Sequence, residues 1–285
     1  MIKKAIILLG GRGTRLGPST ISINKHLLPI YNKPMFFYPL SIMMLGKIKN
    51  FLFIINKGEK KIFENVLGDC KDLGINIDFA EQIHPGGIPD AISLGKNFTK
   101  KDRFAVILGD NFFYGSNLPE LLINNFKKKN IVTLTFPTQN PSQFGILEVD
   151  SNGKIKSFEE KPKNPNSNLA ITGLYVFDRN FYDLAKKLKP SSRNELEIID
   201  ILKYYKKKIT NVKLGRGDVW FDLGTYKDLL NASNFIKNIE DRQSLRIACL
   251  EEIALANRWI TKKNIKNRIK FYKNSSYSDY LKFLL

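Results

Sequence analysis

Short, fully apolar runs of strand length alternate with segments of helical spacing over the first half of the chain. The apolar runs are Ala5–Leu9, Phe51–Ile55, Ile75–Phe79, Phe104–Leu108 and Ile131–Phe136, and the helical segments include 36–45, 59–67, 90–98 and 118–126. Strands that are apolar on both faces are typical of a parallel sheet covered by helices, and the alternation indicates βαβ units. The pattern therefore predicts an α/β fold with a mostly parallel, Rossmann-like sheet flanked by helices.

Beyond about residue 140 the pattern predicts a small mixed segment and then helices. The expected elements are a hairpin with strands at 145–149 and 155–159, a strand at 170–177, a helix at 195–205 and a strand at 212–214. The hairpin is favoured by Asn152-Gly153 between its strands. A long helix should run from an N-cap at Thr225 to about Ile239. We therefore expect one domain over residues 1–240, with a helical C-terminal extension over 241–285 packed on it.

The formal net charge of +19 over 285 residues suggests two opposed interpretations. Basic faces attract nucleic acids and membrane surfaces. The lysine clusters at 127–129, 206–208 and 262–263, however, resemble solvated helix ends and lack the interleaved aromatic residues of a base-stacking surface. The chain is also rich in Lys, Asn, Ile and Phe, which AT-rich codons encode. We therefore attribute the charge to codon bias and solubility, and we expect no nucleic acid partner.

The sequence also indicates the cellular compartment in which the protein is expected. No apolar run approaches the length that spans a bilayer. The run after Met1-Ile2-Lys3-Lys4 ends at Leu9 with no cleavage-type sequence after it, so we interpret it as a strand and not as an export signal. Cys70 and Cys249 have no metal-binding or redox spacing. We expect a cytoplasmic protein with reduced thiols and no membrane partner.

Three glycines within four residues follow the first predicted strand, in the sequence Leu8-Leu9-Gly10-Gly11-Arg12-Gly13-Thr14-Arg15. Glycines let backbone N–H groups approach a ligand, and successive N–H groups in a turn form a concave anion site. The two arginines add fixed positive charge that suits a phosphate. The loop therefore indicates phosphate binding, although a Gly-rich turn that binds nothing fits the same short pattern.

Two carboxylates are candidate metal ligands. Ligands of an open parallel sheet lie beyond the carboxyl ends of its strands, so the loops 8–16, 82–87 and 109–111 should meet at one mouth. Asp110 directly follows a buried-type strand, and Asp222 lies in Trp-Phe-Asp-Leu-Gly-Thr. Mg²⁺ is typically bound by one or two carboxylates together with substrate phosphates. Taken singly, each aspartate also fits ordinary turn chemistry.

Three basic residues are candidates for phosphate contacts. Lys25, in Asn-Lys-His-Leu-Leu-Pro, carries little information by itself in a lysine-rich chain. Lys161, in Glu-Glu-Lys-Pro, fits a phosphate clamp beside Glu160, which would accept from sugar hydroxyls, or a solvated strand end. Arg193 precedes a predicted helix, where it would contact an anion or pair with Glu197. With two histidines and no Ser-His-Asp order, nucleophilic hydrolysis and a zinc site are disfavoured.

Taken in order, the motifs are more informative than any one of them. The Gly-rich loop with its arginine, Lys-x-Leu-Leu-Pro, Leu-Gly-Asp-Asn, Glu-Glu-Lys-Pro and Trp-Phe-Asp-Leu-Gly-Thr together resemble those of the sugar-phosphate nucleotidyltransferases. The likeness extends over essentially the whole chain and includes Lys33-Pro34-Met35, Thr172-Gly173-Leu174-Tyr175 and the segment 249–254. Within this family it is strongest for bacterial members that act on glucose 1-phosphate.

The resemblance implies a reaction and a set of partners. A nucleotidyl group would pass from a pyrimidine nucleoside triphosphate, dTTP first of all, to a sugar 1-phosphate, glucose 1-phosphate first of all, giving dTDP-glucose and pyrophosphate. The sugar phosphate oxygen would attack the α-phosphorus in line, with Mg²⁺ as cofactor and no covalent enzyme intermediate. The resemblance also implies a homotetramer, which in some members is regulated by a downstream sugar nucleotide at a subunit interface.

The resemblance further implies a role for individual residues. Arg15 and Lys25 would hold the triphosphate and the departing pyrophosphate, Lys161 with Arg193 the attacking phosphate, and Asp110 with Asp222 the Mg²⁺. The remaining nucleotide contacts would come from Leu8, Gly10, Gly11, Gly13, Thr14, Gln82 and Gly87, of which Gln82 and Gly87 would read the pyrimidine. The sugar phosphate would lie against Asn111, Gly145, Glu160, Ile171 and Arg193.

Several positions depart from the family pattern. Leu9 replaces an alanine and should lie close to the base or ribose, and Pro89-Asp90 replaces Ala-Gln beside the nucleotide. Phe144 replaces a tyrosine near the sugar, and Leu223 replaces a threonine beside Asp222. Three alternatives therefore stay open: the same reaction with UTP, the same reaction with another hexose 1-phosphate, and a non-catalytic regulatory paralogue that binds sugar nucleotides.

Overall fold

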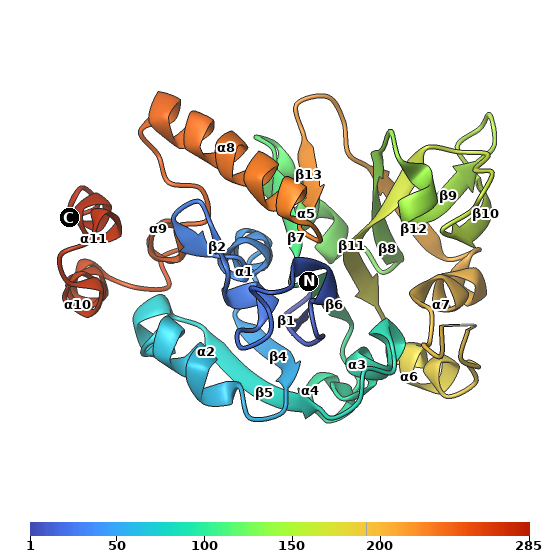
Figure 1. The fold of residues 1–285 in the computed structure, drawn as a ribbon, viewed down its shortest axis with the longest axis horizontal. Coiled ribbons are helices and arrows are strands. Elements are labelled where there is room, and N and C mark those ends of the chain that lie inside the picture. Colours follow the sequence, from blue (N-terminus) through green and yellow to red (C-terminus); the bar gives the residue numbers. More distant parts are fainter. Residues whose placement is uncertain (192) are drawn as a thin grey trace.

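The computed structural model describes residues 1–191 and 193–285, and a nine-stranded sheet runs through its centre (Figure 1). The strands are β1 (Lys4–Leu8), β4 (Asn50–Asn56), β5 (Asn76–Gln82), β6 (Phe104–Leu108), β8 (Ile131–Pro137), β9 (Gly145–Val149), β10 (Ile155–Glu160), β11 (Leu169–Phe177) and β12 (Ile209–Lys213). Their order is β10-β9-β11-β6-β1-β4-β5, with β8 paired to β11 and β12 to β8. Strands β6, β1, β4 and β5 run in the same direction, so their carboxyl ends lie together along one side of the sheet.

The parallel core confirms the predicted α/β fold. Strands β6, β1, β4 and β5 all run parallel, and each corresponds to an apolar run expected from the sequence. The sheet as a whole is mixed, however. Strand β11 is buried along its whole length and pairs antiparallel with both β6 and β8, so β8 runs in the same direction as the core strands but is separated from them by one antiparallel strand. The composition of a buried strand does not reveal its direction.

Helices cover both faces of the sheet. They are α1 (Phe37–Leu45), α2 (Lys60–Leu67), α3 (Ile88–Ser93), α4 (Lys96–Thr99), α5 (Leu118–Lys127), α6 (Asn180–Ala185) and α7 (Ile198–Tyr205). Successive side chains of a strand point to opposite faces. Accordingly Ile7 packs in the core with Phe53 on one side, whereas Ile6 and Leu8 pack with Ile54 on the other.

A second, two-stranded ribbon consists of β7 (Asn111–Tyr114) and β13 (Val219–Asp222), which pair antiparallel with Asp222 opposite Asn111. Helix α8 (Tyr226–Gln243) follows, and the side chain of Thr225 accepts a hydrogen bond from the N–H of Asp228 as the expected N-cap. A short hairpin, β2 (Pro29–Ile30) and β3 (Lys33–Pro34), packs near α8. The ribbon therefore carries a carboxylate from late in the sequence back to the edge where β6 ends.

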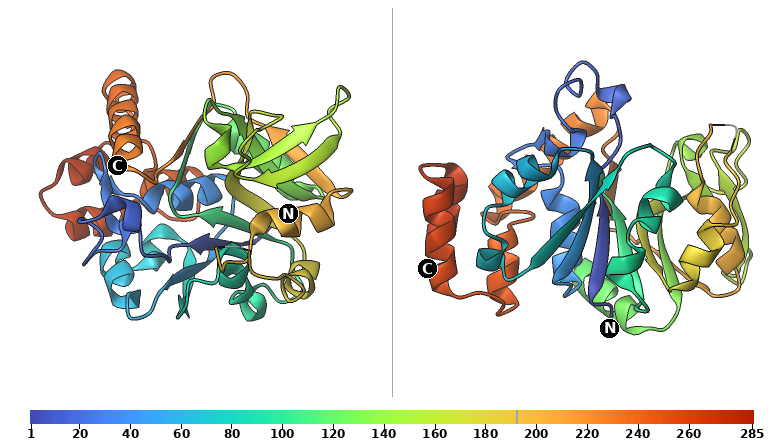
Figure 2. Two further views of the ribbon diagram at one scale, coloured as in Figure 1. Left: turned by 45° about the vertical axis from the view of Figure 1, so that its right-hand side comes forward. Right: turned by 90° about the horizontal axis from the view of Figure 1, so that it is seen from below.

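The C-terminal segment forms α9 (Leu250–Ala256), α10 (Lys262–Tyr272) and α11 (Ser276–Lys282). These helices lie beyond α1 and α2, at the opposite end of the molecule from β9 and β10 (Figure 2). The buried Arg268 of α10 donates to Glu251 of α9 at 2.7 Å and to the carbonyl of Leu67 at the end of α2. The division into 1–240 and 241–285 stays a prediction. Within the described residues, no helix is long and apolar enough to cross a membrane.

Candidate active site

The loops that follow β1, β5 and β6 meet at the carboxyl edge of the parallel core, as expected. They form a pocket of about 380 Å³. The residues that line it include Leu8, Gly10, Gly11, Arg15, Lys25, Gln82, Gly87 and Asp110. The structure therefore brings most of the expected nucleotide contacts to one place.

The Gly-rich loop has the backbone geometry that glycine permits. Gly11 and Gly13 have φ values of +103° and +59°, which L side chains rarely adopt. The N–H of Gly11 donates to Asn56 Oδ1 at 2.9 Å, so the loop is fastened to the end of β4. A Cβ on Gly13 would lie 3.1 Å from the Cβ of Lys25. Thr14 begins a short 3₁₀ turn and lines a neighbouring cavity instead of the main pocket.

Gly87 lies where the loop after β5 approaches another segment. Its φ is +96°, and a Cβ there would lie 2.3 Å from the carbonyl oxygen of Leu196. A single parallel β-bridge joins Gly87 to Leu196, and the Leu196 N–H donates to the carbonyl of Gly86 at 2.9 Å. The loop on the nucleotide side is thus tied to the chain just before α7.

The expectation for Leu9 is wrong. Its side chain is fully buried in the hydrophobic core with Ile7 and Phe53 and does not line the pocket. The preceding residue, Leu8, lines the pocket instead, because consecutive side chains along a strand point to opposite faces. Leu9 also fills the space beside Gly109, where an added Cβ would lie 2.5 Å from its Cδ2. Leu9 is therefore a packing residue and does not contact a base or ribose.

Asp110 and Asp222 are brought together by the β7–β13 ribbon. Lys25 Nζ pairs with Asp110 Oδ2 at 2.5 Å, and both side chains are largely buried. The N–H of Leu223 donates to the carbonyl of Asp110 at 2.8 Å. Asn111 donates to Asp110 Oδ1 at 3.1 Å and accepts from Trp220 Nε1 at 2.6 Å. Asp110 is therefore held in place by a cation on one side and a buried amide on the other.

The two carboxylates differ in their proton affinity. Burial alone would raise the pKa of Asp110, but the ammonium group of Lys25 and the hydrogen bonds to the carboxylate hold that pKa well below its usual range. Burial, followed by the nearby charge of Asp110, raises the pKa of Asp222 well above its usual value. The pair therefore concentrates negative charge in a cleft from which water is partly excluded, which is an environment that favours a cation.

The donor set fits Mg²⁺ better than a metal held by protein ligands alone. Among the described residues, no group of three or more His, Cys, Asp or Glu side chains is arranged to hold a metal ion. Structural zinc sites need four such ligands. Mg²⁺, in contrast, usually keeps waters and is held by one or two carboxylates plus substrate phosphates. Asp110 and Asp222 are a pair of carboxylates of this kind.

A second pocket of about 240 Å³ adjoins the first. It shares Arg15, Ile88, Leu108 and Asp110 with the first pocket, and it is also lined by Asn111, Phe144, Gly145, Glu160, Lys161, Ile171, Trp220 and Asp222. A Cβ on Gly224 would lie 2.7 Å from a terminal nitrogen of Arg15, so the guanidinium group lies against the turn after Asp222. Arg15 therefore stands at the boundary between the two pockets.

Of the two roles considered from the sequence, contact with an anion or pairing with Glu197, Arg193 has the second. Its guanidinium pairs with Glu197 at 2.8 Å and with Glu160 at 3.1 Å. It is not among the residues that line either pocket. Burial and the charge of Glu197 raise the pKa of Glu160, an effect that Arg193 and Lys161 oppose. Arg193 thus orients a pocket residue and does not face the pocket itself.

Two residues of the site were not identified from the sequence. Trp220 packs edge-on against Phe144, with ring centroids 5.1 Å apart, and both line the second pocket. His26 is buried beside Lys25, and its Nδ1 lies 2.8 Å from Asn24 Oδ1. Burial lowers the pKa of His26 to about 3, so the imidazole is neutral. The rarity of histidine and tryptophan in this chain, beside the motif residues, is the signal that would have identified both.

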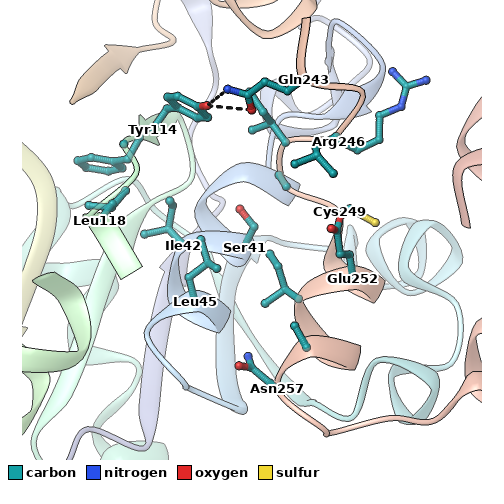
Figure 3. A pocket seen from close by; sticks show the side chains of 17 residues that line it. Ser41, Ile42, Leu45, Tyr114, Leu118, Gln243, Arg246, Cys249, Glu252 and Asn257 are labelled. Carbon is teal, nitrogen blue, oxygen red and sulfur yellow. Dashed lines mark hydrogen bonds between the residues drawn. The ribbon is translucent and has the colours of Figure 1, made fainter. Parts of the chain in front are cut away.

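A separate, largely apolar cavity of about 360 Å³ lies between α1, β7 and the segment that leads into α9 (Figure 3). Ile42, Leu45 and Leu118 contribute much of its apolar wall. At one side, the hydroxyl of Tyr114 is hydrogen-bonded to the side-chain amide of Gln243. None of the site residues expected from the sequence lies here.

The fold and the paired pockets define an α/β protein built to hold a phosphate-bearing nucleotide next to a second ligand. Comparison with known proteins specifies the family. The profile of the nucleotidyl transferase family matches residues 4–239. A glucose-1-phosphate thymidylyltransferase of Neisseria gonorrhoeae is 41% identical over 285 residues, which is 99% of each chain. One of Mycolicibacterium smegmatis is 39% identical over 284 residues, again 99% of each.

A solved structure leads to the same family. The crystal structure of a putative glucose-1-phosphate thymidylyltransferase from Bacillus anthracis, in complex with a sucrose, is 35% identical and superposes with a TM-score of 0.74 over 82% of this chain and 94% of that one. The chain therefore belongs to the nucleotidyl transferase family.

Proposed function

We propose that the protein transfers a thymidylyl group from dTTP to glucose 1-phosphate, which gives dTDP-glucose and releases pyrophosphate. The observation that carries the proposal is the pair of adjoining pockets that share Arg15 and Asp110, one at the Gly-rich loop and the other at Lys161. The names of the full-length relatives supply the particular substrates. In this chemistry two like-charged phosphates must approach each other, so cationic residues at the shared boundary are what the reaction requires.

The proposed mechanism depends on positioning and charge neutralisation. An oxygen of the sugar phosphate attacks the α-phosphorus as the bond to pyrophosphate breaks, and no covalent bond to the protein forms. Arg15 and Lys25 hold the triphosphate and its leaving pyrophosphate. The N–H groups of the Gly-rich loop other than that of Gly11, which donates to Asn56, cradle the phosphates. Lys161 holds the attacking phosphate, and Glu160 accepts from sugar hydroxyls. Asp110 and Asp222 would hold Mg²⁺, which would supply positive charge that neutralises charge developing on the phosphate oxygens.

Lys161→Ala tests the division of labour between the pockets. Turnover should fall roughly a hundredfold or more, because one fixed positive charge beside the attacking phosphate is lost. The dissociation constant for dTTP should stay within about twofold, since Lys161 lines only the second pocket. Steady-state kinetics and calorimetric titration measure the two quantities, and the exposed neighbour Lys163→Ala is the matched control. Parallel loss of dTTP binding and turnover would contradict the assigned role.

The function itself is tested by pyrophosphate release over a panel of nucleoside triphosphates and sugar 1-phosphates, with and without Mg²⁺. We expect the fastest release with dTTP and glucose 1-phosphate, and release that depends on Mg²⁺. A preference for UTP, or for another hexose 1-phosphate, would replace the proposed substrates but keep the reaction. No release with any pair would favour the non-catalytic regulatory paralogue. The presence of Arg15, Lys25, Asp110, Lys161 and Asp222 in the two pockets argues against that alternative.

We further propose that the enzyme is a cytoplasmic homotetramer. The cytoplasm is where nucleoside triphosphates and sugar phosphates are available together. Leu245 and Phe283 of the C-terminal segment are exposed and line one surface pocket together, and exposed apolar patches mark association surfaces. Light scattering coupled to gel filtration would decide the oligomeric state.

A further inference from the structure

The side-chain amide of Gln82, at the end of β5, is held by a charged partner. Its Nε2 donates to Asp90 Oδ2 at 3.0 Å. A carboxylate only accepts hydrogen bonds, so the amide must turn its NH₂ toward Asp90 and its oxygen away. The oxygen accordingly lies over the Gly-rich loop, where a Cβ on Gly10 would be 3.2 Å from Gln82 Oε1. The identity of residue 90 therefore sets which end of the amide is presented.

The exposed end of the amide belongs to the nucleotide pocket. Gln82, Gly10 and Gly87 line this pocket, whereas Asp90 does not. Within the described part of the chain, the side chain of Gln82 has one hydrogen bond to the protein, the one that its Nε2 donates to Asp90, so Oε1 accepts none. The Asp90 carboxylate is itself confined, because a Cβ on Gly86 would lie 2.7 Å from its Cγ. The pocket thus offers a bound nucleotide one fixed hydrogen-bond acceptor.

We propose that Asp90 is a specificity-determining positioning residue, which fixes the Gln82 amide so that the pocket selects pyrimidines with a ring N–H donor. This inference rests on the proposed function, in which the pocket holds a pyrimidine triphosphate. Thymine and uracil carry an N–H at ring position 3 and can donate to Gln82 Oε1. Cytosine has an acceptor at that position, so two acceptors would face each other and one would lose its partner, which costs free energy in a shielded site.

An aspartate at position 90 fixes the orientation of the Gln82 amide, whereas an amide side chain there would not. Asparagine or glutamine at position 90 could donate as well as accept, so Gln82 could then present either its oxygen or its NH₂ to the base. Position 90 is also one of those at which the chain departs from the family pattern.

The test is Asp90→Asn, which removes the charge and keeps the size. The probes are dTTP and 5-methyl-dCTP, which share the 5-methyl group and differ only at base positions 3 and 4. The wild-type protein should bind dTTP at least about tenfold more tightly, and Asp90→Asn should reduce this ratio at least about fivefold, in line with the few kcal/mol that one matched base contact is worth. Asp90→Ala, which removes the partner altogether, should change the ratio in the same direction. The control is Asp78→Asn, an equal charge change at an exposed residue of β5, the strand that carries Gln82. It should leave the binding ratio unchanged.

Equilibrium binding separates this inference from the proposed function. If no triphosphate is turned over but the binding ratio falls in both Asp90 variants, the inference stands and the proposed function fails. If the wild-type enzyme turns over dTTP but both variants keep its binding ratio within twofold, the inference is overturned. Equal weakening of both nucleotides would mean a merely structural role and would also overturn it, as would a wild-type protein that binds neither probe.

Discussion

Asp110→Asn should lower turnover about a thousandfold while the protein stays folded. Asparagine keeps the size of the side chain and can still accept from Asn111, but it removes the charge that pairs with Lys25 at 2.5 Å. A metal that neutralises charge in the transition state contributes several kcal/mol, and each 1.4 kcal/mol is a factor of ten in rate. The measurements are kcat with saturating dTTP and glucose 1-phosphate, and the Mg²⁺ concentration that gives half-maximal rate.

We expect that Mg²⁺ concentration to rise as well in the Asp110 variant. Asp241→Asn, at an exposed position of α8, is the matched control and should change neither quantity. Circular dichroism establishes that the variant is folded. A folded Asp110→Asn protein with turnover within tenfold of the wild type would remove Asp110 from the proposed metal site.

Arg268→Met should lower the free energy of unfolding by about 3–5 kcal/mol, because it leaves the carboxylate of Glu251 buried without its cation. Arg268 and Glu251 are almost completely buried and pair at 2.7 Å. Arg268 also donates to the carbonyl of Leu67 and to the hydroxyl of Tyr272. Glu251 in turn accepts from the hydroxyl of Tyr277 at 2.6 Å. This network joins α9, α10 and α11 to the end of α2.

Urea unfolding measures the effect, with the exposed Lys266→Met on the same helix as control. The double variant Arg268→Met/Glu251→Leu should recover most of the lost stability, because apolar side chains of similar volume replace a buried pair at little cost. A single variant as stable as the wild type would show that the network contributes nothing. A double variant no better than the single one would show that packing, and not the unpaired charge, causes the loss.

The parallel core was predictable because strands covered on both faces must be apolar throughout, as β1, β4 and β6 are. The insertion of antiparallel β11 between β6 and β8 was not, since it depends on pairing between segments that are far apart in the sequence. Asp222 was identified from its motif alone. That it lies beside Asp110 depends on the antiparallel register of β7 and β13, a long-range pairing that neither short strand specifies by itself.

The errors and omissions at the site have a similar origin. Leu9 was wrongly expected near the base. Whether its side chain faces the pocket or the core depends on its position along the strand, and a shift of one residue exchanges the two faces. Arg193 was assigned from its charge, and the sequence could not rank Glu197 against a phosphate as its partner. Asp90 was noticed as a departure from a pattern, but its contact with Gln82 appears only when β5 and α3 are folded together.

The bridge between Gly87 and Leu196 joins the loop of the first pocket to the chain just before Ile198 and Ile199, which line the second pocket. A sugar phosphate that shifted the chain before α7 would therefore also shift the loop beside the base. Linkage then requires reciprocity: whatever factor the sugar phosphate applies to nucleotide affinity, the nucleotide applies to sugar phosphate affinity. Because main-chain atoms would carry such a coupling, changes in the side chain of Leu196 should leave any cooperativity between the substrates largely intact.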